Sequence, residues 1–237
     1  MPILTLYMRR PERNSHRGRA LAAQTLTSSE LSALFRACVE NAEDLVNEAR
    51  LLLDSGHYSR SFMLGHFANE EAAKTVLVGG TRVDLALGRP IDWLNFWWSW
   101  TDHEPKSITA AHSAWIAPAI EERIGSGLPL SEFDGGPWIA PFDPNTIREI
   151  AAAAHAARIG SQYVDWDPTT RAVRQPNLEE GPARLMVATA TFTVGQARLQ
   201  LETIHSSPDW FDAFLEAERS GRSFVVVATE RGLITSG

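Results

Sequence analysis

The sequence predicts an all-α protein, built as an antiparallel helical bundle that ends in a short helix and a strand. Apolar residues recur every three or four positions over several long segments, which is the period of an amphipathic helix. A short link joins the first two of these segments, as in a helical hairpin. The chain has 237 residues, of which 44% are hydrophobic. That content is enough to bury a sizeable core, which excludes disorder over the whole length.

The first two helices are expected to form a hairpin. The first starts at a cap on Ser28 or Ser29 and stops at Gly56. The second runs from about Tyr58 to Val78, and apolar residues cover nearly all of its sides, as in the central helix of a bundle. The apolar positions of the first helix are Leu31, Leu34, Phe35, Cys38, Ala42, Leu45, Val46, Ala49 and Leu52.

Further helices follow along the chain. A third begins near residues 90–92 and is rich in tryptophan, and its aromatic side chains are expected to pack in the core or in an interface. A fourth, at residues 144–159, is bracketed by Asp143 and Gly160. A fifth runs from about residue 177 to residue 205, with Glu180 completing a capping box.

The end of the chain is expected to leave the bundle. Ser207 and Pro208 open a short sixth helix, and the run SFVVVATE predicts a strand of four to seven residues. The predicted division is a basic flexible tail at 1–27, a bundle at 28–205 with a Gly/Pro-rich loop at 124–143, and a helix-strand appendage at 206–237.

Charge is distributed unevenly along the chain. The formal charge is −7, but residues 1–20 hold five arginines and one glutamate, which leaves −11 on the rest of the chain. An acidic body is a poor non-specific binder of nucleic acid, so RNA chemistry requires a confined site.

Cysteine content and the lack of targeting signals indicate a cytoplasmic protein. Cys38 is the only cysteine, so no intramolecular disulfide forms. Neither a secretory signal nor a membrane-spanning run is evident, so no membrane partner is expected.

The use of lysine singles out two positions. The chain has twenty arginines but only Lys74 and Lys106 as lysines. Lysine is a compact charge whose pKa falls on burial, whereas arginine stays charged and planar, so a pocket or a proton-transfer role can exclude arginine. Accident and compositional bias are the competing explanation.

Titratable residues surround both lysines. Glu70, Glu71 and Lys74 form the motif EExxK, with His66 one turn earlier on the same stripe of the second helix. Buried charges must pair, so an active site and a purely structural ion-pair cluster remain alternatives for this motif.

The second lysine has a histidine nearby. His103 precedes Lys106 by three residues and can act as a general acid or base. A solvated helix end explains these two residues equally well. If the third helix returns beside the second, the two motifs converge.

Several short motifs occur in a recognisable order along the chain: Asn41-Ala42 through Leu51, Gly56-His57-Tyr58, Glu70-Glu71-x-x-Lys74, His103-x-x-Lys106 and Tyr163-Val164-Asp165. In this order they resemble the AbiV family of abortive-infection proteins, in the HEPN superfamily. The resemblance spans about residues 35–205. It implies a HEPN-like bundle that forms a homodimer and acts in prokaryotic phage defence, with RNA as substrate and a phage or host protein as trigger.

Many HEPN proteins are metal-independent RNases with the motif Arg-x(4–6)-His. Here the pattern occurs too often to choose a site. If cleavage occurs, we expect His103 to transfer the proton, Lys74 and Lys106 to stabilise phosphate charge, and Glu70 or Glu71 to orient them. Arg148 with His155 is the second choice. The matches outside the tail are Arg50/His57, Arg60/His66, Arg148/His155 and Arg198/His205.

Two other types of function are considered. Neither cofactor nor metal is predicted, because the sequence has no Walker loop, dinucleotide fingerprint, cysteine cluster or HExxH motif. A non-catalytic helical module that senses or sequesters a phage or host protein is the alternative to a ribonuclease or translation-arresting toxin. His66, Tyr163 and Asp165 are predicted binding residues, although packing against the bundle explains the latter two as well.

Overall fold

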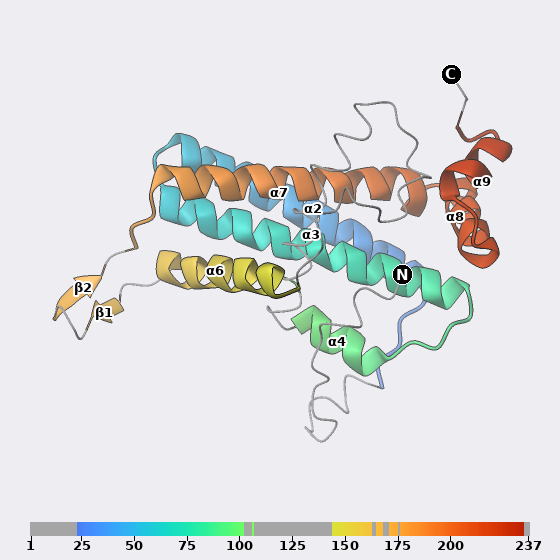
Figure 1. Cartoon of the computed structure of the whole chain (residues 1–237), viewed down its shortest axis with the longest axis horizontal. Coiled ribbons are helices and arrows are strands. Elements are labelled where there is room, and N and C mark those ends of the chain that lie inside the picture. The colour runs from blue at the N-terminus through green and yellow to red at the C-terminus, as the bar shows by residue number, and fades with distance from the viewer. Residues whose placement is uncertain are drawn as a thin grey trace.

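The structure, a computed structural model, is a bundle of long helices, in which the second long helix runs antiparallel to the first and the third runs parallel to the second (Figure 1). It describes residues 23–101, 106, 144–162, 165–167, 171–174 and 176–234. The predicted all-α fold is confirmed. Three long helices pack against one another, and two shorter ones lie along the central helix (Figure 1). The long helices are α2 (Ser28–Asp54), α3 (Tyr58–Ala86) and α7 (Glu180–Gln200), and the shorter ones are α4 (Trp93–Thr101) and α6 (Pro144–Gln162).

Local sequence signals set the ends of the α2–α3 hairpin. The cap of α2 is Thr27, one residue before the predicted position, because its hydroxyl accepts from the Glu30 backbone N–H while the Glu30 carboxylate accepts from the Thr27 backbone N–H. This reciprocal pair satisfies two backbone donors that the first helical turn leaves open. After α2, Gly56 adopts a φ of +75°, the left-handed conformation that glycine allows at a helix end.

Helix α3 is the centre of the bundle, as its all-round apolar pattern predicts. It extends to Ala86, beyond the predicted end, because Thr81 and Val83 also bury their side chains. Its contact with α7 is close at Gly65, where an added Cβ would lie 3.1 Å from Met186 Cγ. The main core gathers residues from α2, α3, α4 and α7 and includes Leu31, Phe35, Val39, Ala72, Val78, Phe96 and Val194.

The crossover from α6 back to the bundle contains a small hairpin. Strands β1 (Asp165–Asp167) and β2 (Ala172–Arg174) pair antiparallel, with Trp166 opposite Val173. The fifth predicted helix is present as α7 followed by the π-helical turn η3 (Leu201–His205). It begins at Glu180, three residues later than predicted, and the predicted capping box is wrong, because the N-cap is Glu179 and no side chain caps the helix. A π turn inside a long helix inserts a residue and commonly marks a functional or strained position.

The predicted C-terminal strand is wrong. Residues 224–230 form helix α9 (Phe224–Glu230), which packs against α8 (Pro208–Ser220). Valine-rich sequence favours strands, but Phe224, Val227 and Ala228 recur at helical spacing, and the latter two are fully buried. This apolar face shares a small core with Ala213 and Ala217 of α8. Burial therefore outweighs the local preference for a strand.

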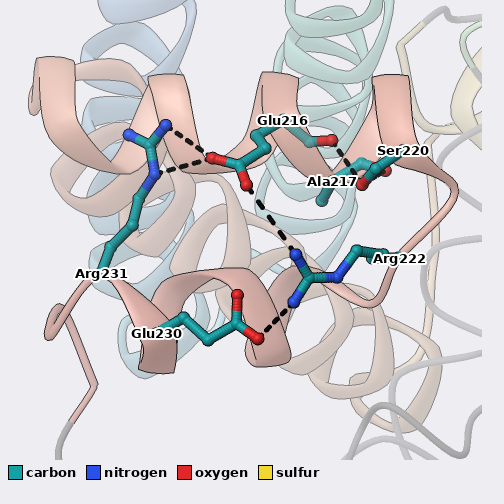
Figure 2. Close-up of polar contacts among 6 residues, drawn as sticks. All are labelled: Glu216, Ala217, Ser220, Arg222, Glu230 and Arg231. Atoms are coloured by element: carbon teal, nitrogen blue, oxygen red, sulfur yellow. Dashed lines mark hydrogen bonds and ion pairs between the residues drawn. The ribbon is translucent and has the colours of Figure 1, made fainter.

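Ion pairs on the surface accompany the packing of α8 and α9 (Figure 2). The Glu216 carboxylate on α8 accepts from Arg231 Nη2 at 2.7 Å, and its other oxygen lies 3.9 Å from Arg222 Nη1. Arg222 also pairs with Glu230 of α9 (Figure 2). These groups are exposed, so their contribution to stability is small and sensitive to salt.

Candidate active site

Glu70 is the centre of a buried polar cluster on α3. Its Oε1 lies 3.2 Å from His66 Nε2, one turn earlier on the helix, and its Oε2 lies 4.0 Å from Lys106 Nζ. The residues are nearly inaccessible, with exposed fractions of 4% for Glu70, 3% for His66 and 8% for Lys106. Water therefore screens these charges weakly. In the described part of the chain His66 Nε2 makes no hydrogen bond, so its approach to Glu70 is a close electrostatic contact.

Glu71 and Lys74 form a second ion pair next to it. Lys74 Nζ donates to Glu71 Oε1 at 2.5 Å, and the side chains are 13% and 20% exposed. The Lys74 ammonium also lies 4.6 Å from the centre of a Trp100 ring on α4. A cation over an indole face is attracted by the negative charge of the ring's π cloud. Lys74 is thus held by a carboxylate and an aromatic ring from two different helices.

Aromatic packing positions α4 against α3. Phe96 is buried in the main core, and its ring makes edge contacts with Trp93 and Trp97 and stacks on Trp100. Trp97 Nε1 donates to the Gln24 carbonyl oxygen at 2.9 Å. Trp93, Trp97 and Trp100 are partly buried and pack against the main core, which is one of the two places expected for them. Packing of α4 on α3 brings Trp100 to Lys74, and the chain that follows carries Lys106 to Glu70.

The structure thus brings four of the five predicted catalytic residues to one region of α3. Glu70, Glu71 and Lys74 lie within two turns of this helix, and Lys106 joins them from the chain that follows α4. The position of Lys106 relative to the EExxK motif was left open by the sequence. His103 lies outside the described residues, as does Tyr163 of the predicted binding residues. Asp165 begins strand β1.

The second-choice pair lies on α6. Arg148 and His155 are seven residues apart on this helix, about 10 Å along its axis. His155 Nδ1 lies 3.3 Å from Arg158 Nη2. Arg158 was not among the predicted site residues. The sequence signal was an arginine on the same helical face as a histidine, three residues away, in an otherwise alanine-rich helix.

A second histidine–arginine pair forms at the far end of α3. Arg82 Nη1 lies 2.7 Å from His205 Nδ1, and the guanidinium lies 3.8 Å from the centre of the Phe211 ring. Burial, and then the charge of Arg82, lower the pKa of His205 to about 4. His205 is therefore neutral at physiological pH. The partner implied by the sequence motif, Arg198, pairs with Glu43 on α2 instead.

Cys38 lies on the face of α2 directed to this part of α3. Burial is the main cause that raises the pKa of its thiol to about 12, and the charge of Glu71 adds to it. A thiol needs to ionise to act as a nucleophile or as a metal ligand. Cys38 is therefore a structural core residue, as the sequence predicts.

The cluster has the chemical groups needed to handle an anionic reacting centre. Two ammonium groups can stabilise negative charge that develops on a phosphate, and two carboxylates can orient them. In a site screened weakly by water such interactions are stronger than at the surface. Within the described ranges no group of three or more His, Cys, Asp or Glu side chains is arranged to hold a metal ion.

Comparison with known protein families identifies a match. A family model described as AbiV, of the HEPN class, matches residues 30–177, which is more than half of the chain. The match includes α3, α4, α6 and α2 from residue 30 onward. It also includes the predicted catalytic residues Glu70, Glu71, Lys74 and Lys106. No curated protein and no solved structure matches the chain significantly. None of the helices in the described residues is long and apolar enough to cross a membrane.

Proposed function

Because the chain belongs to the AbiV family of HEPN proteins, we propose that it acts in phage defence as a metal-independent endoribonuclease. The observation that carries this proposal is the approach of Lys106 to Glu70, 4.0 Å away in the buried cluster that adjoins Lys74 and Glu71. Both lysines of a chain with twenty arginines thus lie at one place. A structural role alone would not require lysine at both positions, since arginine also pairs with carboxylates.

The proposed reaction is attack of a ribose 2′-hydroxyl on the adjacent phosphodiester. His103 takes the proton of the hydroxyl, and the new O2′–P bond forms a 2′,3′-cyclic phosphate while the P–O5′ bond breaks. The leaving 5′-oxygen takes a proton from water, to which His103 then returns the proton that it accepted. Lys74 and Lys106 stabilise the charge that develops on the phosphate oxygens. Glu70 and Glu71 hold the two ammonium groups in place. Electrostatic stabilisation of this kind is often worth a factor of about 10² to 10³ in rate for each group.

Cleavage of total cellular RNA by the purified protein in EDTA tests the proposal. Wild type is compared with His103→Ala and Lys74→Ala variants whose helicity and thermal unfolding match wild type. Loss of cleavage in both variants is the expected result. No cleavage by wild type, with phage lysate added as a source of trigger, would overturn it. EDTA removes divalent ions, so a contaminating metal-dependent nuclease is excluded by the same assay.

The burial of the cluster favours a second candidate function. Glu70 and Lys106 are less than a tenth exposed, which also fits a structural ion-pair cluster inside a helical module that binds a phage or host protein. Lys74→Arg separates the two, because it retains the charge. A binding module keeps phage protection with this variant, whereas a shaped catalytic site loses it.

We also propose that the protein works as a homodimer in the cytoplasm, where the RNA is. Light scattering coupled to size-exclusion chromatography gives the mass of the particle directly. A mass twice that of the chain, 26.2 kDa, is the expected result, and a monomer at micromolar concentration would contradict it.

A further inference from the structure

Arg158 on α6 is a buried cation with unusual partners. It is 7% exposed, and its guanidinium lies 5.6 Å from the centre of the Phe67 ring on α3. Its Nη2 meets His155 Nδ1 at 3.3 Å, and its Nε is buried without a hydrogen-bond partner. In the described residues no carboxylate pairs with Arg158, although exposed arginines such as Arg184 have one. Burial of an unpaired charge is costly, so an anion at this position would relieve it.

The position of Arg158 relates it to the lysine cluster. Helix α6 packs against α3, and Phe67 lies one turn before Glu71 on the same face of α3, with Lys74 one turn further on. The guanidinium is therefore about two helical turns from the Lys74 ammonium along this face. An extended anion with several charges a few ångströms apart matches such a row of cations.

We propose that Arg158 is an anion-binding residue that takes a phosphate group of the substrate, and that His155 positions it. This inference rests on the proposed function for the identity of the substrate. The Nε–H and a neighbouring Nη–H of a guanidinium form a planar pair of donors that fits two oxygens of one phosphate. His155 accepts through Nδ1 from Nη2, which fixes the plane of the guanidinium and leaves Nε available.

A phosphate fits better than a carboxylate for reasons of charge. Among the described residues considered on this side of α3, the cations are Arg158, Lys74 and Lys106 and the anions are Glu70 and Glu71. With the carboxylates already paired to the lysines, Arg158 carries the excess positive charge. A phosphodiester chain brings one negative charge for each nucleotide, so one phosphate can bind Arg158 while its neighbour reaches the lysines.

Nuclear magnetic resonance of the Arg Nε–H groups in the full-length protein tests the proposal without relying on cleavage. Inorganic phosphate is the first probe, and a single-stranded oligodeoxyribonucleotide, which lacks the attacking 2′-hydroxyl, is the second. The resonance of Arg158 is identified by its loss in Arg158→Lys, or by through-bond assignment if that variant does not fold. Arg184→Lys, an exposed arginine on α7, is the matched control.

The expected result is a saturable shift of the Arg158 resonance with both probes, at a lower concentration for the oligonucleotide. Arg158→Lys is expected to weaken oligonucleotide binding at least about tenfold, and Arg184→Lys to leave it unchanged. His155→Phe is expected to broaden or move the Arg158 resonance before any ligand is added. No shift with either probe, or a shift with phosphate alone, would overturn the proposal. Oligonucleotide binding without RNA cleavage would sustain this inference while refuting the proposed ribonuclease activity.

Discussion

Replacing Glu70 with Gln should destabilise the protein by about 3 kcal/mol, because the buried Lys106 ammonium then loses the carboxylate charge nearby. The two charged groups are 4.0 Å apart, a distance at which they attract by about 4 kcal/mol for an effective dielectric constant of about 20. Lys106→Met should cost a similar amount. The double variant should be more stable than the sum of the single effects predicts, with a coupling energy of about 2 kcal/mol.

Urea unfolding followed by circular dichroism measures all four proteins of this cycle. The midpoint shift at constant slope gives each change in the free energy of unfolding. The exposed i,i+4 pair of Glu180 and Arg184 is the control, and its cycle with Gln at both positions should give no measurable coupling. A coupling below about 0.5 kcal/mol for Glu70 and Lys106 would refute the convergence of the two lysine motifs.

Three further outcomes follow from buried groups elsewhere in the bundle. Gly79→Ala should destabilise by about 1–2 kcal/mol, because the new Cβ would lie 3.2 Å from both His205 Nε2 and Phe35 Cε2; Gly80→Ala, with open space around it, should instead stabilise slightly, as chemical denaturation can measure. Because the pKa of His205 is lowered from 6.5 to about 4, the stability contributed by its neutral ring is complete above about pH 6.5 and is lost as the pH falls toward 4, by about 3 kcal/mol at most. A His205→Gln variant whose free energy of unfolding falls with pH as steeply as that of wild type would contradict this. Cys38, with a thiol pKa of about 12, should react with a disulfide reagent at pH 8 only when the protein unfolds, so rapid labelling of the native protein would be inconsistent with its burial.

The sequence predicts those parts of the fold that depend on local pattern. The 3–4 spacing of apolar residues marks α2 over its full length, because one face of this helix is buried and the other exposed. Gly56 marks the turn after α2, because few other residues adopt its positive φ without strain. The resemblance to AbiV also comes from short local motifs, and the family match confirms it.

Features that depend on tertiary packing were predicted less well. The strand expected at the C-terminus is helix α9, since Phe224 and Val227, three residues apart, pack against a face of α8. Pairing of histidine with arginine follows proximity in space: His205 meets Arg82, which is 123 positions away. A pattern of the form Arg-x(4–6)-His carries no information on such contacts.

The candidate site falls between these cases. EExxK places Glu70, Glu71 and Lys74 on adjacent faces of one helix, which helical periodicity alone predicts. The approach of Lys106 depends on how α4 packs on α3, and that packing is set by Phe96 and its aromatic neighbours. The sequence made the lysines conspicuous by their rarity but left their separation open.

The most direct test of the central claim is the rate of RNA cleavage in EDTA by Lys74→Arg beside wild type. The variant keeps the positive charge next to Glu71 and Trp100 but replaces a compact ammonium with a planar guanidinium. If the cluster is a catalytic site, the rate should fall at least about a hundredfold, with little change in the unfolding midpoint. Cleavage at the wild-type rate by this variant would contradict a catalytic role for the cluster.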